Sequence, residues 1–497
     1  MKRIIALMLA LSMLSFMLFS CSESKNAADD TETEAAAPTD VPNAAGFEEE
    51  TEPPDPADLI EKKDFEGYGF RILNNISNFA YTNIGEEGLT GEALDDAVFN
   101  RNKTVEDLLN ITFKLEKREV GDTNATMQKL VAAGQDEYDV YTLDLNMQLG
   151  IVSSGGNIDA ATISTLDFDS PWWNRQAIDS IAIDDSVYCF FGDLHTGYFE
   201  SHAVAVFNKI ILNNLNLADP YEHVYNNTWT MDNMITMMDA AKIDMNGDGK
   251  WTVDDQYGFS MFEGNFSTAF TVGGYADLIE RDESGYPVFN GLSERFVDIY
   301  NKVAGTIFSD RTNNAINARG SLPGSLELYR LMFIFGRSLF LVTQIGVLKD
   351  MRDVDFELGV VPMPKFDEEQ PDYRSLIFQG ANAVGIPITN PDPDRTGLVL
   401  EHMAARSTGT VRDVYLNQTL DFKYIQDRES QEMMDIILNT GLFELASVYG
   451  WGGLNGTILD GINSGNINLV SKVARFSKAV NNGIQKTIAQ YEKLKDR

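Results

Sequence analysis

Apolar and polar positions follow two alternating periods in the first third of the chain. Short runs with the two-residue spacing of strands are separated by longer stretches in which apolar residues recur at helical intervals. The order strand, helix, strand, helix, strand predicts a parallel α/β sheet with crossover helices. We expect strands at 69–74, 111–120 and 138–145, and helices at 92–110 and 124–134, the second helix ending on Gly134.

The same pattern continues further along the chain, so we expect a second set of α/β elements. Thr230 stands where an N-cap is needed, and Pro393 precedes another helical stretch. The expected strands are 203–209, 337–343, 356–364 and 382–388, and the expected helices are 228–244, 393–406 and 468–494, the last a long helix or a helix pair.

The N-terminus has the features of an export signal. Lys2 and Arg3 precede an apolar run over 4–19, and no polar stop signal suggests a permanent span. The run ends in "LFSC", which resembles the lipobox of bacterial lipoproteins. We expect a signal peptide over 1–20 and a lipid on Cys21, the alternative being an ordinary secretory signal with an incidental cysteine.

The stretch after the signal is rich in Ala, Thr, Pro and acidic residues and has no apolar periodicity. It has too little to bury to offset the entropy of ordering, so we expect 21–62 to be a disordered acidic tether. If Cys21 carries lipid, Cys189 stands alone, and no intramolecular disulfide is possible.

The charge balance excludes one class of partner. The chain has 39 Lys and Arg against 75 Asp and Glu, a formal net charge of -36. Nucleic-acid binding by counterion release needs an excess of cations, which this chain lacks. We therefore expect no nucleic-acid partner.

Four segments carry a resemblance to a known family. They are "DDAVFNRN" (95–102), "SPWWNRQAIDSIAIDDSVYCFFGDL" (170–194), "NKIILNNLNLADPYEHVYNNTWTMDNMITMMDAAKIDMNGDGKWTVDDQYGF" (208–259) and "FELGVVPMPKFDEEQPDY" (356–373). The chain resembles the family 1 extracellular solute-binding lipoproteins that serve ABC importers, commonly for sugars and oligosaccharides. The resemblance implies the type II periplasmic-binding fold, with two α/β lobes, a hinge and a ligand cleft between the lobes.

The resemblance also implies a domain division and a set of partners. Lobe 1 would take 63–208 with 380–428, and lobe 2 would take 209–379 with 429–497. The chain would cross the hinge near Asn208 and Lys209, again near Gly380, and a third time around 425–435. The expected partners are a carbohydrate ligand and the permease subunits of an ABC importer. We expect the protein to be a monomer that is lipid-anchored on the outer face of the cell membrane.

Aromatic residues in loops are candidate platforms for a sugar ring. Trp172 and Trp173 follow a proline in a loop-like stretch, and Tyr449 and Trp451 lie in a glycine-rich loop. We expect these four side chains to contact ligand, and the alternative is that they pack within a lobe.

Polar residues at strand ends are the second group of ligand candidates, because ligands of open α/β sheets bind beyond the carboxyl ends of strands. Asn74, Asn75, Asp144 and Asp193 end expected strands, and their alternative role is to cap a helix or a turn. The ligand candidates from lobe 1 are Asn75, Asp144 and Asp193, and those from lobe 2 are Asn265, Phe266 and Gln344.

The stretch "DMNGDGKWTVDD" (244–255) has the residue order of a calcium-binding EF-hand loop, with Gly249 in sixth position. A single loop that runs into a strand does not fit a calcium sensor, so we expect a structural calcium site. Its ligands would be Asp244, Asn246, Asp248, the carbonyl of Lys250, Thr252 and Asp255. The alternative is an unmetallated turn held by its own side-chain to backbone hydrogen bonds.

An enzyme would need a catalytic constellation, and the sequence offers none. It has no G-x-S-x-G elbow and no phosphate-binding glycine loop, and its four histidines lack metal-ligand spacing. Cys189 sits in an apolar run, where a thiol is normally inert. We expect no enzymatic activity. A glycoside hydrolase with paired carboxylates and a surface glycan-binding adhesin without a transporter remain as alternatives.

Overall fold

The computed structural model describes residues 55–76, 83–261, 266–308, 315–317, 328–420, 428–466 and 468–495. The chain divides into two units, 1–53 and 54–497, and every described element belongs to the second. That unit contains both hydrophobic clusters of buried side chains, so it carries its own core. The signal peptide, Cys21 and most of the expected tether lie outside the described residues.

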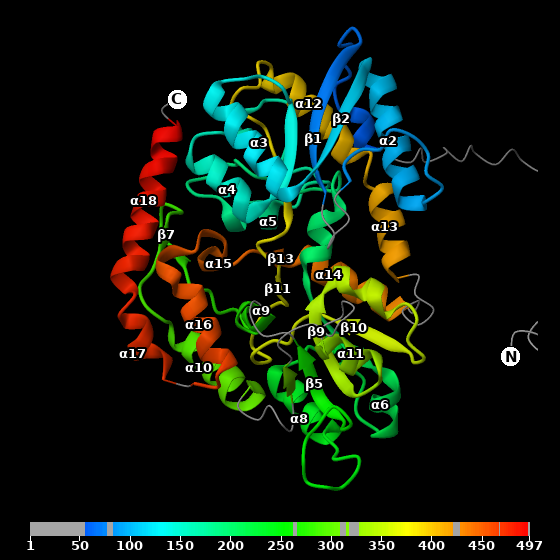
Figure 1. Cartoon of the computed structure of the whole chain (residues 1–497), viewed down its shortest axis with the longest axis vertical. Helices are drawn as coiled ribbons and strands as arrows, with labels where there is room; N and C mark the ends of the chain where they lie inside the picture. Colours follow the sequence, from blue (N-terminus) through cyan, green and yellow to red (C-terminus); the bar gives the residue numbers. More distant parts are fainter. Residues whose placement is uncertain are drawn as a thin grey trace, which may run out of the picture. The chain divides into compact units, whose positions relative to one another are not determined.

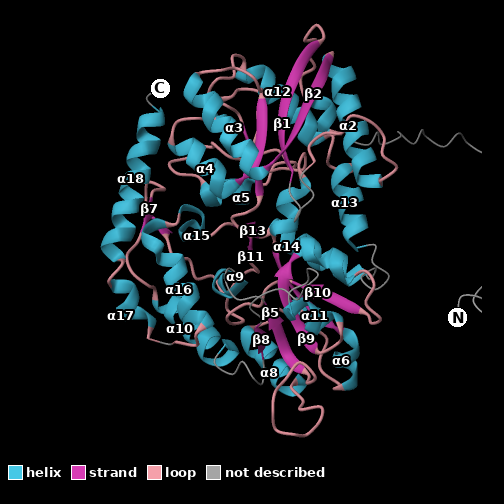
Figure 2. Cartoon of the chain, viewed as in Figure 1, coloured by secondary structure: helices cyan, strands magenta, loops and turns pink. Residues whose placement is uncertain are grey.

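The first sheet, which we call lobe 1, has the strand order β12-β3-β1-β2. Its strands β1 and β2 lie side by side between α3 and α2 in Figures 1 and 2. The three strands expected from the sequence run parallel, and β12 is antiparallel to β3. Helices cover both faces, α2 on one and α3 on the other. The strands are β1 (Tyr68–Ile76), β2 (Ile111–Glu119), β3 (Val140–Asp144) and β12 (Asn382–Gly385), and the helices are α2 (Ala93–Leu109), α3 (Val120–Ala133), α4 (Leu145–Ser153), α5 (Arg175–Ile181), α12 (Pro393–Ala405) and α13 (Val411–Leu420).

The local signals in lobe 1 act as the sequence predicts. Val98 and Val105 are fully buried on the inner face of α2, and Gly134 ends α3 in the left-handed conformation with φ of 62°. The left-handed conformation has no steric cost for glycine. The Gly134 N–H donates to the carbonyls of Leu130 and Val131 and so completes the last turn of α3. The predicted strand–helix alternation is confirmed.

The second sheet, which we call lobe 2, has the order β10-β4-β9-β5-β8 and mixes parallel and antiparallel pairs. The predicted cap Thr230 accepts a hydrogen bond from Asn233 N at 3.3 Å and begins α8. The strands are β4 (Ala203–Asn208), β5 (Tyr257–Met261), β8 (Ala315–Asn317), β9 (Ser338–Gln344) and β10 (Leu358–Val361), and the helices are α6 (Lys209–Asn214), α7 (Pro220–Tyr225), α8 (Met231–Ala241), α9 (Phe266–Gly273), α10 (Glu294–Lys302), α11 (Leu328–Ile334) and α14 (Arg428–Asn439).

Two short strands lie where the chain passes between the lobes. β11 (Ser375–Leu376) pairs in parallel with β13 (Gly441–Leu442), and Phe378 N donates to Ser201 O at 3.0 Å. β11 contacts β4 of lobe 2 and β12 belongs to lobe 1, so the chain returns to lobe 1 between these two strands, in the region where the return crossing near Gly380 is expected.

The first crossing differs from the expected one. β4 pairs with β9 and β10 of lobe 2, so the chain leaves lobe 1 before Ala203 and not at Asn208 and Lys209. The reason is that a buried apolar strand has the same sequence pattern in either lobe, so only its pairing partners show to which sheet it belongs. The third crossing falls between α13, which contacts α2, and α14, which contacts β10.

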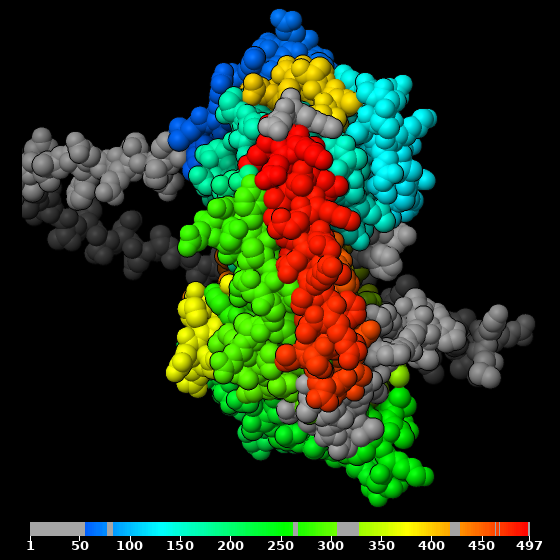
Figure 3. Space-filling view, turned by 90° about the vertical axis from the view of Figure 1, so that its left-hand side faces the viewer, coloured from blue at the N-terminus to red at the C-terminus, as the bar shows by residue number. Residues whose placement is uncertain are grey.

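The C-terminal elements contact both lobes. α15 (Leu445–Tyr449) contacts α4 and α5, and α16 (Leu454–Asn463) contacts α9. The expected helix pair is α17 (Leu469–Ala474) and α18 (Ser477–Lys495), and α18 lies along one face of the molecule beside the β6 (Glu280–Arg281) and β7 (Pro287–Val288) hairpin (Figure 3).

The expected tether ends earlier than residue 62. A 3-10 turn at Pro56–Leu59 packs on lobe 1, where Asp58 pairs with Arg406 at 2.7 Å. The His402 ring and Glu61 O are in hydrogen-bond contact at 2.8 Å. These contacts place 55–62 in the folded body. Among the described helices, none combines the length and the apolar character that crossing a membrane requires.

Candidate functional site

Three polar side chains meet at the carboxyl edge of the lobe 1 sheet. Asn75 comes from the end of β1 and Asp144 from the end of β3, while Asn382 begins the antiparallel β12 directly opposite Asp144. The side-chain amides of Asn75 and Asn382 both donate to Asp144 Oδ1, at 3.2 and 3.1 Å. We call these three residues the strand-end cluster, and it stands where an open α/β sheet presents its ligand site.

The cluster leaves two acceptors without a donor. Asn75 is 0% and Asn382 is 4% exposed, and the Oδ1 atom of each has no hydrogen-bond partner among the described residues. A buried acceptor left unpaired costs about 1–3 kcal/mol, so native proteins rarely keep one without a reason. Hydroxyl groups of a ligand are donors that would satisfy both atoms.

Asp144 adds a carboxylate with an altered acidity. Burial raises the pKa of Asp144 to about 6, and the hydrogen bond from Asn75 opposes the rise. Above that pH the group is an ionised acceptor, which binds hydroxyl donors more strongly than a neutral acid does. The cluster as a whole is suited to a neutral polyhydroxylated ligand.

Asn74, beside the cluster, has a structural role. It is fully buried, its Oδ1 accepts from Ile84 N at 2.7 Å, and its amide donates to Asn75 O. Asn382 is the member that the sequence analysis missed. The signal available was "GAN" (380–382), in which Asn382 stands two residues after the expected return crossing at Gly380.

Asp193 lies in a different place. It is 4% exposed, accepts from the Thr408 hydroxyl at 2.7 Å and faces Arg412 at 3.7 Å. Burial raises its pKa to about 6 and Arg412 opposes the rise. It borders a cavity of about 190 Å³ together with Trp173 and Asn439, and no member of the strand-end cluster lines that cavity.

The structure does not support Trp172 and Trp173 as open platforms. They are 6% and 5% exposed, and their indole N–H groups donate to the two carboxylate oxygens of Glu401 at 2.8 and 2.9 Å. Burial raises the pKa of Glu401 to about 7. A sugar platform must present a ring face, so Trp172 is a packing anchor, and Trp173 offers only the part that borders the small cavity.

Trp451 and Tyr449 are also packed rather than open. Their rings stack with centroids 4.7 Å apart, Trp451 is 4% exposed and its indole donates to Thr487 on α18 at 2.9 Å. The Tyr449 hydroxyl donates to Ile181 O at 3.0 Å. Both rings therefore pack against the C-terminal helix, the alternative role for them, because glycines in the loop let that helix approach closely.

The lobe 2 candidates are only partly described. Gln344 ends β9 opposite Ala203, where β4 begins, so it lies at the edge of the lobe 2 sheet next to the first crossing. The adjacent Ile345 N donates to His202 O at 3.0 Å. Asn265 and the side chain of Phe266 lie outside the described residues.

The calcium-like loop forms a self-contained turn. Asp244 accepts from the N–H groups of Gly247 and Gly249, both at 2.7 Å, and Asn246 and Asp248 accept from the N–H groups two residues ahead. Asp255 accepts from Thr252 N and Met245 N. The residue types suit calcium, but the described residues contain no group of three or more His, Cys, Asp or Glu placed to hold a metal. The calcium site stays a prediction.

Comparison with known proteins gives a fold and no sequence family. No family model matches the chain, and no curated protein matches it. The structure is similar to UspC of M. tuberculosis (TM-score 0.56, 13% identity, 83% of this chain and 99% of that one) and to a cyclic alpha-maltosyl-1,6-maltose binding protein of Arthrobacter globiformis (0.55, 11%, 84% and 99%). It is also similar to an ABC substrate-binding protein of Listeria monocytogenes in complex with cycloalternan (0.50, 15%, 86% and 99%). The chain has the two-lobed α/β fold of these binding proteins, which confirms the predicted fold class.

Proposed function

We propose that this chain is the solute-binding receptor of an ABC importer for a carbohydrate, with an oligosaccharide as the best candidate. The observation that carries the proposal is the strand-end cluster, in which a carboxylate and two unpaired amide oxygens stand at the carboxyl ends of the lobe 1 strands, where open α/β sheets bind ligand. The fold comparisons support it, because the similar structures include an ABC substrate-binding protein in complex with cycloalternan, a cyclo/maltodextrin-binding protein complexed with maltotetraose and a cyclic alpha-maltosyl-1,6-maltose binding protein.

In this proposal the ligand stabilises a closed arrangement of the lobes. Lobe 1 contributes Asn75, Asp144 and Asn382, and lobe 2 contributes Gln344 from the facing sheet edge. A ligand that contacts both lobes favours the arrangement in which both sets of contacts are made. The protein then needs no chemistry on the ligand, only recognition and release to the permease.

The location and the metal belong to the proposal as well. A lipid on Cys21 would hold the folded body on the outer face of the membrane, where the permease subunits lie. A calcium ion in 244–255 would have a structural role, since the loop between α8 and β5 lies at the end of lobe 2 away from β11 and β13 (Figure 1).

The test is calorimetric titration of the unit from Pro54 onward against linear and cyclic oligosaccharides, followed by chromatography of the sugar. Binding with the sugar recovered intact supports the receptor. Conversion of the sugar supports the glycoside hydrolase instead. If the protein binds the sugar but its removal leaves sugar uptake unchanged in transport assays, the result supports the adhesin.

A further inference from the structure

A groove lies between the two lobes, next to the residues that lead into the hinge strand β13. It has a wide part of about 540 Å³ and a narrow part of about 190 Å³, and both parts are lined by Gln176 of α5 and Asn439 of α14. Because α5 belongs to lobe 1 and α14 to lobe 2, both lobes form this groove, which we call the hinge groove. No member of the strand-end cluster lines either part, so the hinge groove is separate from the site proposed above.

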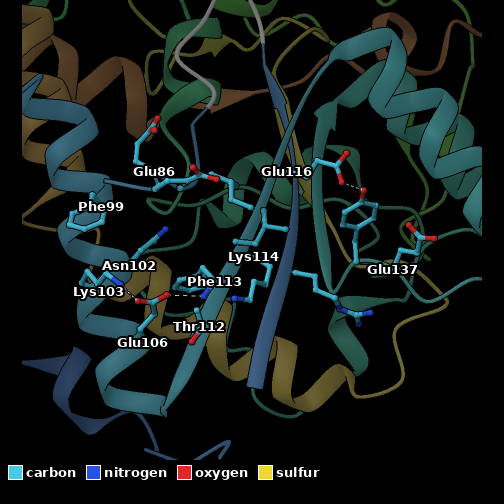
Figure 4. A pocket seen from close by; sticks show the side chains of 16 residues that line it. Glu86, Phe99, Asn102, Lys103, Glu106, Thr112, Phe113, Lys114, Glu116 and Glu137 are labelled. Carbon is cyan, nitrogen blue, oxygen red and sulfur yellow. Dashed lines mark hydrogen bonds and ion pairs between the residues drawn. The ribbon is translucent and has the colours of Figure 1, made fainter. Parts of the chain in front are cut away.

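The wide part of the hinge groove has polar groups that are free to bind a ligand. Four of its exposed side chains have no hydrogen-bond or ion-pair partner among the described residues: Gln176, Asp372, Asp435 and Asn439. The groove of about 500 Å³ beside β2 is different, because Glu106 there pairs with Lys103, and Glu116 accepts a hydrogen bond from Tyr138 (Figure 4). The free acceptors therefore distinguish the hinge groove as a candidate site.

An aromatic residue lines the wide part in a strained backbone conformation. Tyr275 follows α9 with a φ of 63°, in the left-handed region that bulky side chains rarely adopt. Tyr275 N donates to Val272 O and Ala276 N donates to Thr271 O, both at 3.0 Å, which is the helix-ending turn that usually has glycine at this position. A tyrosine here costs conformational free energy, and such strain is concentrated at functional sites.

The Tyr275 ring is fixed from behind. The Arg374 guanidinium lies over the ring, 3.5 Å from its centroid, and Arg374 Nη1 donates to both carboxylate oxygens of Asp277, at 2.9 and 3.0 Å. Arg374 therefore covers one face of the ring. The ring is half-buried and borders the wide part of the groove, so it can serve there as a rigid platform.

The charges around the platform select a neutral ligand. Asp372 and Asp435 repel an anion, and among the described residues no Lys or Arg lines the wide part. A cation on the ring is opposed by Arg374, which already occupies one ring face. A sugar ring places its C–H groups on an aromatic face and donates its hydroxyl groups to carboxylate and amide oxygens.

We propose that the hinge groove is a second carbohydrate site, in which Tyr275 is the platform and Asp372 and Asp435 accept hydrogen bonds from sugar hydroxyl groups. The site goes beyond the proposed receptor function, because it does not require the strand-end cluster to bind anything. Free side chains on a partly open groove give weak binding, so we expect a dissociation constant on the order of 1 mM for a single sugar residue.

The experiment is saturation-transfer NMR of the unit from Pro54 onward with glucose, galactose, mannose and N-acetylglucosamine, each at about 10 mM. The Asn382→Ala variant is the background, since it lacks one member of the strand-end cluster. We expect at least one sugar to give a signal there, and Tyr275→Gly in the same background should reduce it at least fivefold. Glycine suits the left-handed backbone, so this variant should melt no lower than its parent.

Two further variants test whether the ring itself binds the sugar. Tyr275→Phe keeps the ring and should keep the signal. Tyr68→Ala is the matched control, because Tyr68 is also half-buried and lies under an arginine, Arg395 at 3.6 Å, but lines neither part of the hinge groove. This control should leave the signal unchanged.

The hinge groove and the receptor function can fail separately. If none of the four sugars gives a signal in Asn382→Ala, or if Tyr275→Gly leaves the signal at full strength, the second site is overturned. Neither result affects the receptor, which depends on oligosaccharide binding by the wild type. A signal that Tyr275→Gly removes supports the second site even where Asn382→Ala leaves oligosaccharide affinity unchanged.

Discussion

Gly441 stands directly against the ring of His202 in the hinge, with no room for a side chain between them. An ideal Cβ on Gly441 would overlap the ring Nε2 and Cδ2 atoms. His202 is fully buried on the first crossing, and its ring is fixed by contacts between Nδ1 and the carbonyls of Tyr198 and Phe199, both at 3.1 Å. The first crossing and strand β13 are therefore packed directly on each other at Gly441.

Gly441→Ala should destabilise the protein by about 1–3 kcal/mol, because the added methyl group forces the buried ring or the β11–β13 pair to move. Gly380→Ala is the matched control in the same hinge, since nothing lies within 4 Å of the Cβ position there. Urea unfolding of both variants checks the prediction. Equal stability of the two variants would show that the hinge yields easily at this contact.

The Glu401 carboxylate that holds Trp172 and Trp173 should make stability depend on pH. Its pKa is raised from 4.5 to about 7 by burial, so the folded state retains a proton that the unfolded chain loses. The stabilisation is complete below about pH 4.5 and is lost as pH rises to about 7, by up to about 3 kcal/mol.

Glu401→Gln cannot ionise, so the stability difference between wild type and this variant should fall across that same window. Urea unfolding from pH 4.5 to 8 measures it. The variant itself should be less stable at low pH, since its amide group opposes one indole donor. If the stability difference between wild type and Glu401→Gln does not change with pH, Glu401 is not the source of the pH dependence.

Asp144 should make ligand affinity depend on pH. With a pKa of about 6, one-tenth of the group is ionised at about pH 5, so binding by hydroxyl donors should be up to about tenfold weaker there than at pH 7. Asp144→Asn should bind more weakly and show little pH dependence. Asp193→Asn is the control, because Asp193 has a similar pKa but borders a cavity that no member of the strand-end cluster lines, so this variant should leave the dependence in place.

Calcium should raise the melting temperature if the 244–255 loop binds it. Saturation at 100 times the dissociation constant contributes about 2.7 kcal/mol, which corresponds to a shift of a few degrees. Asp248→Asn should reduce the shift, and Asp107→Asn on the exposed face of α2 should not. Equal melting temperatures in calcium and in chelator would identify the loop as the self-bonded turn that its hydrogen bonds form.

The sequence predicts the secondary-structure elements better than it predicts their tertiary contacts. Periodicity placed β1, β2, β3 and their helices, because each is decided by its own residues. It assigned β4 to the wrong lobe, since pairing with β9 is a long-range fact. Strand-end logic found Asn75 and Asp144 together, because carboxyl ends of parallel strands share an edge.

The aromatic candidates show the limit of residue type as a guide. Trp172, Trp173 and Trp451 stand in proline- or glycine-rich loops, which favoured open platforms. Each indole instead finds a buried acceptor, Glu401 or Thr487, from a distant part of the chain. A tryptophan whose N–H has a buried hydrogen-bond acceptor packs well, and the sequence around the tryptophan does not identify that acceptor.

The most direct test of the central claim is the affinity of Asn382→Ala for the oligosaccharide that the wild type binds, measured by calorimetry. Asn382 is the member of the strand-end cluster with an unpaired acceptor on the return strand. Asn100→Ala, exposed on α2, is the matched control. We predict that Asn382→Ala weakens binding at least tenfold, with unchanged affinity in the control and in Trp172→Phe. Full affinity in Asn382→Ala together with loss in Trp172→Phe would contradict the account and return the ligand to the tryptophan pair.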